Sequence, residues 1–171
     1  MGGVRLVPPR FWEPPADPES RRLYPFSPEP ALVGHAFDRP DRSGGSTLTM
    51  NYLDEGAGDP VVMLHGNPTW SFYYRNLVLA LRDSYRCIVP DHIGCGLSDK
   101  PPETLYDYSL KSRIDDLEAL LDQLNLRENL TIVLHDWGGM IGMAFSARHP
   151  ERIRRIVASN TGAFPLPSTK R

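Results

Sequence analysis

The stretch Leu130-Thr-Ile-Val-Leu-His-Asp136-Trp137-Gly138-Gly139-Met-Ile-Gly-Met143 decides the fold of this chain. It opens with an apolar run that contains β-branched residues, which predicts a buried strand. Asp136 and Trp137 follow this run, and two glycines then lead into a segment of helical character. The stretch therefore predicts a strand, a tight turn and a helix, with the carboxylate of Asp136 at the turn.

The sequence on either side alternates apolar runs of strand length with segments of helical periodicity. We expect strands at residues 33–37, 48–53, 60–64, 87–89 and 154–159, and helices at residues 70–82, 109–126 and from the turn to about residue 148. Alternating strands and helices form a parallel sheet through right-handed crossovers. The predicted fold class is therefore α/β, a mostly parallel sheet with helices on both faces.

The predicted helix at residues 109–126 has the clearest pattern. Its apolar residues share one face at helical spacing, and they are Leu110, Ile114, Leu117, Leu120, Leu121 and Leu124. The acidic residues expected on the opposite face are Asp115, Asp116, Glu118 and Asp122.

The N-terminal region differs in composition from the rest. Residues 1–30 hold eight of the 17 prolines, and proline removes backbone donors and biases the residue before it towards extended forms. We therefore expect an irregular leader at residues 1–30 and globular chain from residue 31 to 171. The peptide Leu23-Tyr-Pro-Phe26 could dock on the domain through its aromatic rings.

Composition excludes several classes of function. The net charge of −2 and the pI of about 6.2 favour neither a nucleic acid nor an acidic membrane as partner. The two cysteines, Cys87 and Cys95, imply no disulfide framework or metal site. The first residues lack the apolar region of a signal peptide, and no apolar run approaches the roughly 20 residues that span a bilayer. A cytoplasmic protein without a membrane span is the expectation.

Unusual residues follow four of the predicted strands, and ligands of open α/β sheets gather at the carboxyl ends of strands. The four groups are His65-Gly-Asn67-Pro68, Asp91-His-Ile-Gly-Cys-Gly-Leu-Ser-Asp99, His135-Asp136-Trp137 and Asn160-Thr161. Three histidines stand at these strand ends. We expect them to hydrogen-bond loops, and they are His65, His92 and His135. We expect a functional site at this edge of the sheet.

These groups resemble the α/β-hydrolase superfamily, in its haloalkane-dehalogenase-like branch with an aspartate nucleophile. The matching pieces are His65-Gly-Asn-Pro-Thr-Trp-Ser71, the stretch from Pro90 to Pro101, His135-Asp-Trp-Gly-Gly-Met-Ile-Gly142 and His149-Pro-Glu-Arg152. The chain is most similar to the β-lactone decarboxylases of bacterial olefin biosynthesis, through residues 23–26, 91–96 and 160–167. The resemblance implies that residues 31–171 are the N-terminal part of an α/β-hydrolase core domain.

Asp136 matches the nucleophile of the resembled family. A carboxylate with a reference pKa of about 3.9 is ionised at neutral pH and needs no base in order to attack. Attack on an sp³ carbon that bears a leaving group would give an alkyl ester on the enzyme. The alternative is a structural Asp that caps the following helix.

Asn67 and Trp137 match the pair that stabilises the leaving group or transition state in the same families. A leaving halide or a developing oxyanion needs donors aimed at it in a dry pocket, and these residues offer a side-chain amide and an indole N–H. The alternatives are a turn-forming Asn before proline and a core aromatic residue. Epoxide hydrolases typically carry Phe at the position of Asn67, which disfavours that activity.

Two members of the expected triad are not found in the sequence. The family's general-base histidine lies near the C-terminus, and no histidine follows His149. The triad acid follows the sixth strand as Glu or the seventh as Asp; Asn160 stands at the first position, which favours the second. We expect the base, the acid, the cap domain and the last strands to lie beyond Arg171, and the chain itself to lack turnover.

The resemblance implies an enzyme that uses Asp136 on a hydrophobic small-molecule electrophile, without a metal or organic cofactor. The preferred activity converts a β-lactone to an alkene and CO2. A haloalkane dehalogenase, which gives an alcohol and a halide, is the alternative, followed by an epoxide hydrolase. A ligand-binding module or an inactive gene fragment remains open as a different class.

Overall fold

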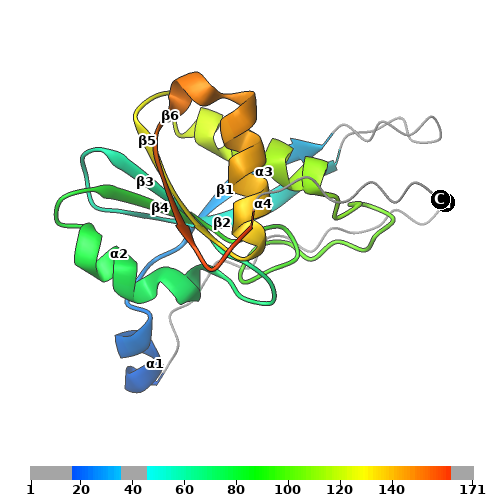
Figure 1. The fold of residues 1–171 in the computed structure, drawn as a ribbon. Helices are drawn as coiled ribbons and strands as arrows, with labels where there is room; N and C mark the ends of the chain where they lie inside the picture. The colour runs from blue at the N-terminus through cyan, green and yellow to red at the C-terminus, as the bar shows by residue number, and fades with distance from the viewer. Residues whose placement is uncertain (1–16, 36–45, 163–171) are drawn as a thin grey trace.

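The structure is a computed structural model that describes residues 17–35 and 46–162 (Figure 1). Its strands are β1 (Glu29–His35), β2 (Ser46–Glu55), β3 (Pro60–Leu64), β4 (Arg86–Pro90), β5 (Leu130–His135) and β6 (Ile153–Ser159). Its helices are α1 (Pro18–Leu23), α2 (Arg75–Leu81), α3 (Leu110–Gln123) and α4 (Trp137–Arg148), with 3-10 turns η1 (Ser71–Tyr74) and η2 (Pro150–Arg152).

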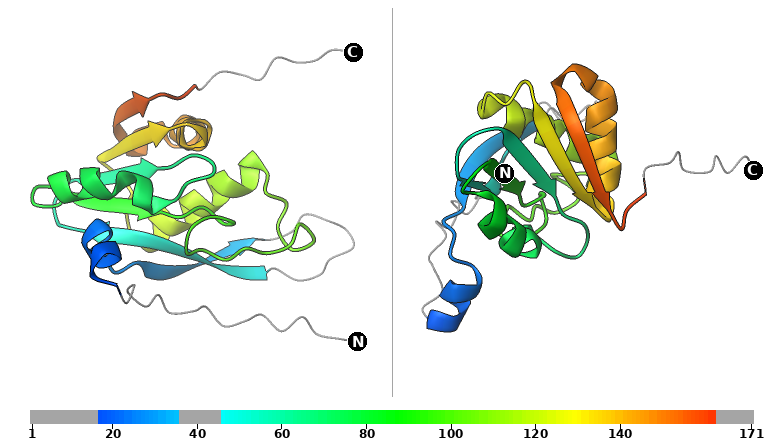
Figure 2. Two further views of the ribbon diagram at one scale, coloured as in Figure 1. Left: turned by 90° about the horizontal axis from the view of Figure 1, so that it is seen from below. Right: turned by 60° about the vertical axis from the view of Figure 1, so that its left-hand side comes forward.

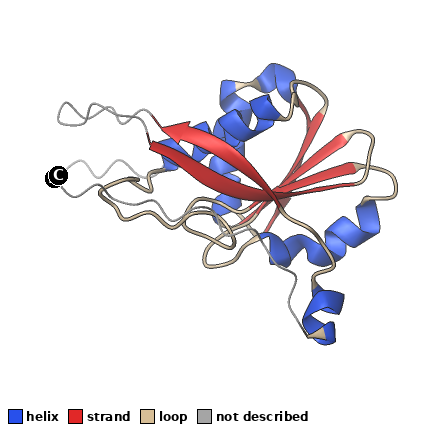
Figure 3. Ribbon diagram, turned by 180° about the vertical axis from the view of Figure 1, so that it is seen from behind, coloured by secondary structure: helices blue, strands red, loops and turns tan. Residues whose placement is uncertain are grey.

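The strands form one sheet in the order β1-β2-β4-β3-β5-β6. β3 runs parallel to β4 and β5, and β5 runs parallel to β6, whereas the β1–β2 and β2–β4 pairs are antiparallel. β1 and β6 therefore lie at opposite ends of the sheet (Figure 2), and β1 and β2 form a long twisted ribbon (Figure 3). The prediction of a mostly parallel sheet is confirmed.

Helices cover both faces of the sheet, as the sequence predicts. On one face, α3 and α4 bury Leu117, Leu120 and Phe145 against apolar side chains from the strands. On the other face, Val78 of α2 packs with Val61 and other strand residues. Figure 1 shows α3 and α4 on one side and α2 with α1 on the other. No helix within residues 17–35 and 46–162 is long and apolar enough to cross a bilayer.

Helix α3 begins at a capped terminus and uses the predicted apolar face. The hydroxyl of Ser109 accepts a hydrogen bond from the backbone N–H of Ser112 at 3.1 Å, which satisfies a free donor of the first turn. Asp116 differs from the prediction, because its side chain is buried and accepts a 2.7 Å hydrogen bond from the hydroxyl of Tyr106. A buried tyrosine needs an acceptor, and this pairing outweighs the exposed position that charge alone suggests.

The prediction of an irregular leader at residues 1–30 is wrong for its last part. α1 occupies Pro18–Leu23, and β1 already begins at Glu29. Asp17 caps α1 by accepting 3.0 Å hydrogen bonds from the N–H groups of Glu19 and Ser20. Proline is well tolerated in a first helical turn, because its missing donor is not needed there. Residues 1–16 lie outside the described residues.

The aromatic peptide after α1 docks on the domain, as predicted. Tyr24 and Phe26 are buried, and the Tyr24 ring lies 5.0 Å from the ring of Trp70. The Tyr24 hydroxyl shares a buried 2.6 Å hydrogen bond with the hydroxyl of Ser71. This contact ties the N-terminal segment to the loop that follows β3.

Replacing Tyr24 with phenylalanine is expected to lower the free energy of unfolding by about 1–2 kcal/mol, because the buried Ser71 hydroxyl loses its hydrogen bond to Tyr24. Urea denaturation measures this change. Tyr85→Phe removes a hydroxyl from a side chain that is 37% exposed and serves as the control. Equal effects of the two variants would contradict the importance of the Tyr24–Ser71 bond.

Candidate active site

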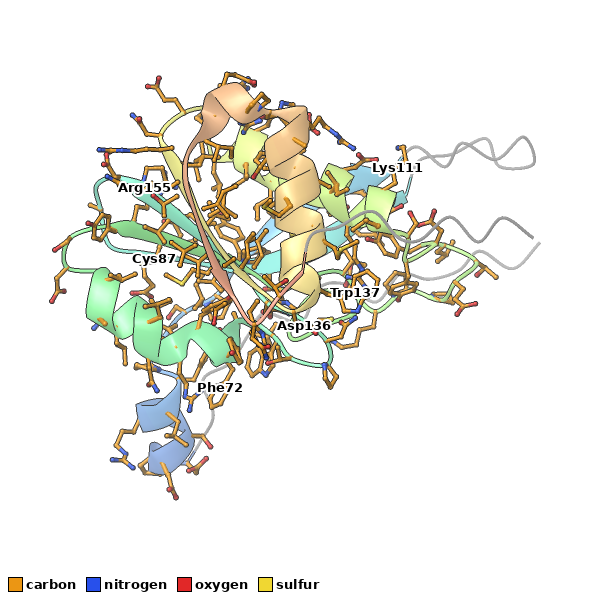
Figure 4. The ribbon with its side chains drawn as sticks, in the orientation of Figure 1. Phe72, Cys87, Lys111, Asp136, Trp137 and Arg155 are labelled. Carbon is orange, nitrogen blue, oxygen red and sulfur yellow. The ribbon has the colours of Figure 1, made fainter. Side chains whose placement is uncertain are left out.

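The turn between β5 and α4 is a sharp elbow with Asp136 at its apex (Figure 4). Asp136 has φ 51° and ψ −125°, a strained backbone conformation outside the left-handed helical region that L-residues of any type seldom adopt. The next turn of chain passes so close to β3 that a Cβ on Gly138 would lie 2.0 Å from the carbonyl oxygen of Leu64. Only glycine fits there, which explains the Gly after Trp137 in the sequence.

The Asp136 carboxylate is exposed, and a backbone N–H group from a neighbouring loop holds it in place. Its Oδ1 accepts a 2.9 Å hydrogen bond from the N–H of Asn67. The backbone N–H groups of Trp137 and Asn67 lower the pKa of this carboxyl below its usual value. The side chain makes no capping hydrogen bond to the first turn of α4. The structural alternative, an Asp that caps the helix, therefore does not describe this residue.

Gly66 lets the loop after β3 approach the carboxylate. A Cβ on Gly66 would lie 2.2 Å from Asp136 Oδ1, so a larger residue would displace either the loop or the carboxylate. The backbone N–H of the next residue, Asn67, donates to the same oxygen. The side-chain Oδ1 of Asn67 accepts a 3.8 Å hydrogen bond from the thiol of Cys95, so the Nδ2 of this side chain faces away from Cys95.

An apolar pocket of about 510 Å³ opens beside the elbow. Its lining residues are Leu110, Asp136, Trp137, Met140, Asn160, Thr161 and Gly162. Trp137 is 46% exposed, so it is not the core aromatic residue that the alternative interpretation requires. The structure thus brings Asp136 and Trp137 to one pocket, whereas Asn67 contacts Asp136 but does not line that pocket.

His65 and His92 form a buried pair beneath the site. The backbone N–H of His92 donates to His65 Nε2 at 3.1 Å, so His65 carries its proton on Nδ1, which donates to the carbonyl of Gly66 at 2.8 Å. His92 Nε2 in turn donates to the carbonyl of His65 at 3.1 Å. Burial lowers the pKa of His65 to about 4 and that of His92 well below its usual range. Both rings are therefore neutral, and they hydrogen-bond the backbone of the loops, as predicted.

Asp91, at the end of β4, fastens two more loops. Its carboxylate accepts the N–H of Ser71 at 2.7 Å and the N–H of Leu97 at 2.8 Å. The side chain is buried, and burial raises its pKa. Because Ser71 also bonds Tyr24, the N-terminal segment, the loop after β3 and the loop after β4 form one connected network.

His135 precedes the elbow and is a structural neighbour of it. Its ring stacks on that of Tyr73 with centroids 4.4 Å apart. Its Nδ1 is buried and has no hydrogen-bond partner among residues 17–35 and 46–162. The ring thus packs between the elbow and η1, which agrees with the expectation that it is not the general base.

Thr161 contacts the elbow in a way that sequence reasoning missed. β5 pairs with β6 so that His135 lies beside Ser159. Asp136 and Asn160 are the next residues after these two strands. The N–H of Asp136 donates to the carbonyl of Asn160 at 3.3 Å, and the Thr161 hydroxyl donates to the carbonyl of Asp136 at 2.6 Å. The signal that could have found Thr161 is the pairing register of two adjacent parallel strands.

Known proteins share this fold and sequence. The cis-3-alkyl-4-alkyloxetan-2-one decarboxylase of Shewanella oneidensis is 71% identical over 121 residues, which are 71% of this chain and 38% of that protein. Haloalkane dehalogenase 2 of Mycobacterium tuberculosis is 39% identical over 140 residues, which are 82% of this chain and 47% of that protein. The chain therefore spans less than half the length of these relatives.

A solved structure shows the same architecture. The haloalkane dehalogenase DatA from Agrobacterium tumefaciens C58 matches with a TM-score of 0.64 and 31% sequence identity, over 78% of this chain and 41% of that one. A family model described as the alpha/beta hydrolase fold matches residues 59–170, well over half of the sequence. The resemblance seen in the sequence is thereby confirmed, and the chain belongs to the α/β-hydrolase family.

Proposed function

We propose that Asp136 is the nucleophile of an enzyme that acts on a hydrophobic electrophile, and that its substrate is a β-lactone, which is converted to an alkene and CO2. One observation carries the proposal: an ionised carboxylate, held by the backbone N–H of Asn67, stands at a sharp elbow beside an apolar pocket. The choice of a β-lactone rests on the 71% identical relative from Shewanella oneidensis, whose name denotes a decarboxylase of such a ring.

In the proposed first step, one carboxylate oxygen of Asp136 attacks the ring carbon that carries the lactone oxygen. A new carbon–oxygen bond forms, the ring carbon–oxygen bond breaks, and its electron pair stays on the released carboxylate. Oδ1, which the Asn67 N–H holds, becomes the carbonyl oxygen of the ester, and Oδ2 attacks. Loss of CO2 then supplies the electron pair of the double bond and expels Asp136 as a carboxylate.

Asn67 and Trp137 are the proposed stabilisers of charge on the departing oxygen. Trp137 supports this role because it lines the pocket beside Asp136 and is half-exposed there. Asn67 supports it through its contact with the nucleophile and through an amide whose oxygen is turned to Cys95. The proposed chemistry needs no metal or organic cofactor, because the carboxylate is itself the nucleophile.

A haloalkane is the second candidate substrate, favoured by the 39% identical haloalkane dehalogenase 2. The same attack on a carbon–halogen bond would release halide and leave an alkyl ester that water must hydrolyse. No histidine follows His149 in this sequence, so we expect the ester to persist on this chain.

The thiols of Cys87 and Cys95 are free, which supports a cytoplasmic location as part of the proposal.

Incubating the 171-residue chain with 1-bromohexane or a hydrophobic β-lactone tests the nucleophile directly. We expect one adduct per chain with 1-bromohexane, an added hexyl group, and peptide mass spectrometry should place it on Asp136. A β-lactone should open on the same residue and then leave as an alkene and CO2, so the alkene is the product to measure. Consumption of the lactone faster than that of the bromide would favour the lactone as substrate.

Two variants control this experiment. Asp136→Ala should abolish the adduct, whereas Asp83→Ala, at an exposed aspartate remote from the elbow, should leave it unchanged. An adduct that survives Asp136→Ala would overturn the proposed nucleophile. Reversible binding of both reagents without any adduct or alkene would instead support a ligand-binding protein.

A further inference from the structure

We infer that Thr161 is a positioning residue that sets the orientation of the peptide between Asp136 and Trp137. The inference rests on the proposed function, because it concerns how the nucleophile is aligned. It starts from the 2.6 Å hydrogen bond that the Thr161 hydroxyl donates to the carbonyl oxygen of Asp136. The N–H of Gly139 donates to the same oxygen at 3.0 Å.

The first turn of α4 leaves room for this hydroxyl. A Cβ on Gly139 would lie 1.8 Å from Thr161 Oγ1, so any larger residue at 139 would expel the hydroxyl from its place. The two glycines after Trp137 are therefore needed for different contacts. Gly138 leaves room for the carbonyl of Leu64, and Gly139 leaves room for the hydroxyl of Thr161.

The consequence for the nucleophile follows from peptide planarity. The carbonyl of Asp136 and the N–H of Trp137 belong to one rigid plane and point in opposite directions. A donor that fixes the carbonyl oxygen thus also fixes the direction of the Trp137 N–H. That N–H belongs to the residue next to Asp136 and is the largest cause of the lowered pKa of the Asp136 carboxyl. Thr161 acts on the carboxylate through this plane and does not touch it.

Thr161 also lines the pocket, so the experiment must separate alignment from pocket shape. Thr161→Val keeps the shape and removes the hydroxyl, and Thr161→Ser keeps the hydroxyl and removes the methyl group. The reaction of the chain with 1-bromohexane is followed by intact mass at increasing reagent concentration. This gives a maximal alkylation rate and a half-saturating concentration for each variant.

We expect Thr161→Val to lower the maximal rate about tenfold at an unchanged half-saturating concentration, because misalignment by a fraction of an ångström is costly. The pH midpoint of its alkylation should move upwards, since the carboxylate loses a well-oriented donor. Thr161→Ser should retain the wild-type rate and midpoint. A Ser variant as slow as the Val variant, or a Val variant as fast as wild type, would overturn the inference.

A second measurement does not depend on reactivity. Hydrogen exchange of the Gly139 amide should accelerate at least several-fold in Thr161→Val, because the carbonyl that accepts it is no longer fixed, and should stay at the wild-type rate in Thr161→Ser. Unchanged exchange in Thr161→Val would refute the positioning role. If the wild-type chain forms no adduct, the proposed nucleophile fails, while the exchange data still decide whether Thr161 orders the elbow.

Discussion

Replacing Gly138 with alanine is expected to lower the free energy of unfolding by about 3 kcal/mol, the upper end for overpacking of a tight interior. The added Cβ would lie 2.0 Å from the carbonyl oxygen of Leu64 and 3.0 Å from that of His65. Both atoms are backbone of β3 or the residue after it, so no side-chain rotation can relieve the contact. Either α4 or the end of β3 must move, and both carry the elbow.

Urea denaturation of Gly138→Ala measures this effect as a lower midpoint, with the slope of the transition as a check on two-state unfolding. Ala147→Ser, on the exposed side of the same helix, is the matched control and should change the free energy by less than about 0.5 kcal/mol. A Gly138→Ala midpoint equal to that of the control would show that the elbow is looser than the structure indicates.

The second large effect is expected on acidification. The unfolded chain protonates His65 near its ordinary pKa of about 6.5, whereas the folded chain does so only near pH 4. The unfolded state therefore binds more protons between these values, and stability is complete above pH 6.5 and lost as the pH falls to 4. His65 alone accounts for about 3 kcal/mol of this loss, and His92 adds to it in the same direction.

Burial disfavours the charged form of both rings and is the main physical reason. The hydrogen bond between His92 and His65 acts in the same direction. A proton on His65 Nε2 would face the backbone N–H of His92, so that two donors would oppose each other. Asp91 acts in the opposite sense, because burial raises the pKa of its carboxyl and the folded state then takes up its proton first. This contribution is the same in variants of the histidines and cancels when they are compared.

Urea denaturation at pH 7 and pH 4.5 tests the prediction. His92→Gln replaces the ring donor by an amide that can still reach the carbonyl of His65, and it should lose clearly less stability on acidification than wild type. His149→Gln changes a half-buried histidine at the C-terminal end of α4 and should keep most of the wild-type loss. Equal losses in wild type and His92→Gln would contradict a neutral buried pair.

Much of the sheet could be read from the sequence, because buried parallel strands are continuous apolar runs. The run at 60–64 coincides with β3, and the run before Asp136 ends where β5 ends. The helix expected at 70–82 is less regular: η1 precedes α2, and Trp70 is extended. Trp70 packs on Tyr24, a contact across 46 residues that local periodicity cannot register.

The elbow itself was predictable, since the glycines after Trp137 and the strand before Asp136 both indicate it. Its supports were not, because they depend on which strands are neighbours. Thr161 and Gly66 reach Asp136 only through the sheet order β3-β5-β6. The roles of Asn67 and Trp137 in stabilising charge stay predictions, although both residues lie at the elbow.

The hydrogen bonds described for the Asp136 backbone and carboxylate all come from nearby segments: the loop after β3, the first turn of α4 and the two residues after β6. On the proposed function, these segments set the placement of the nucleophile. We then expect single substitutions in them to alter the aim of the Asp136 carboxylate, and one alkylation event to measure that change. The same expectation would make the elbow a scaffold for irreversible, site-selective labelling at an aspartate in protein engineering.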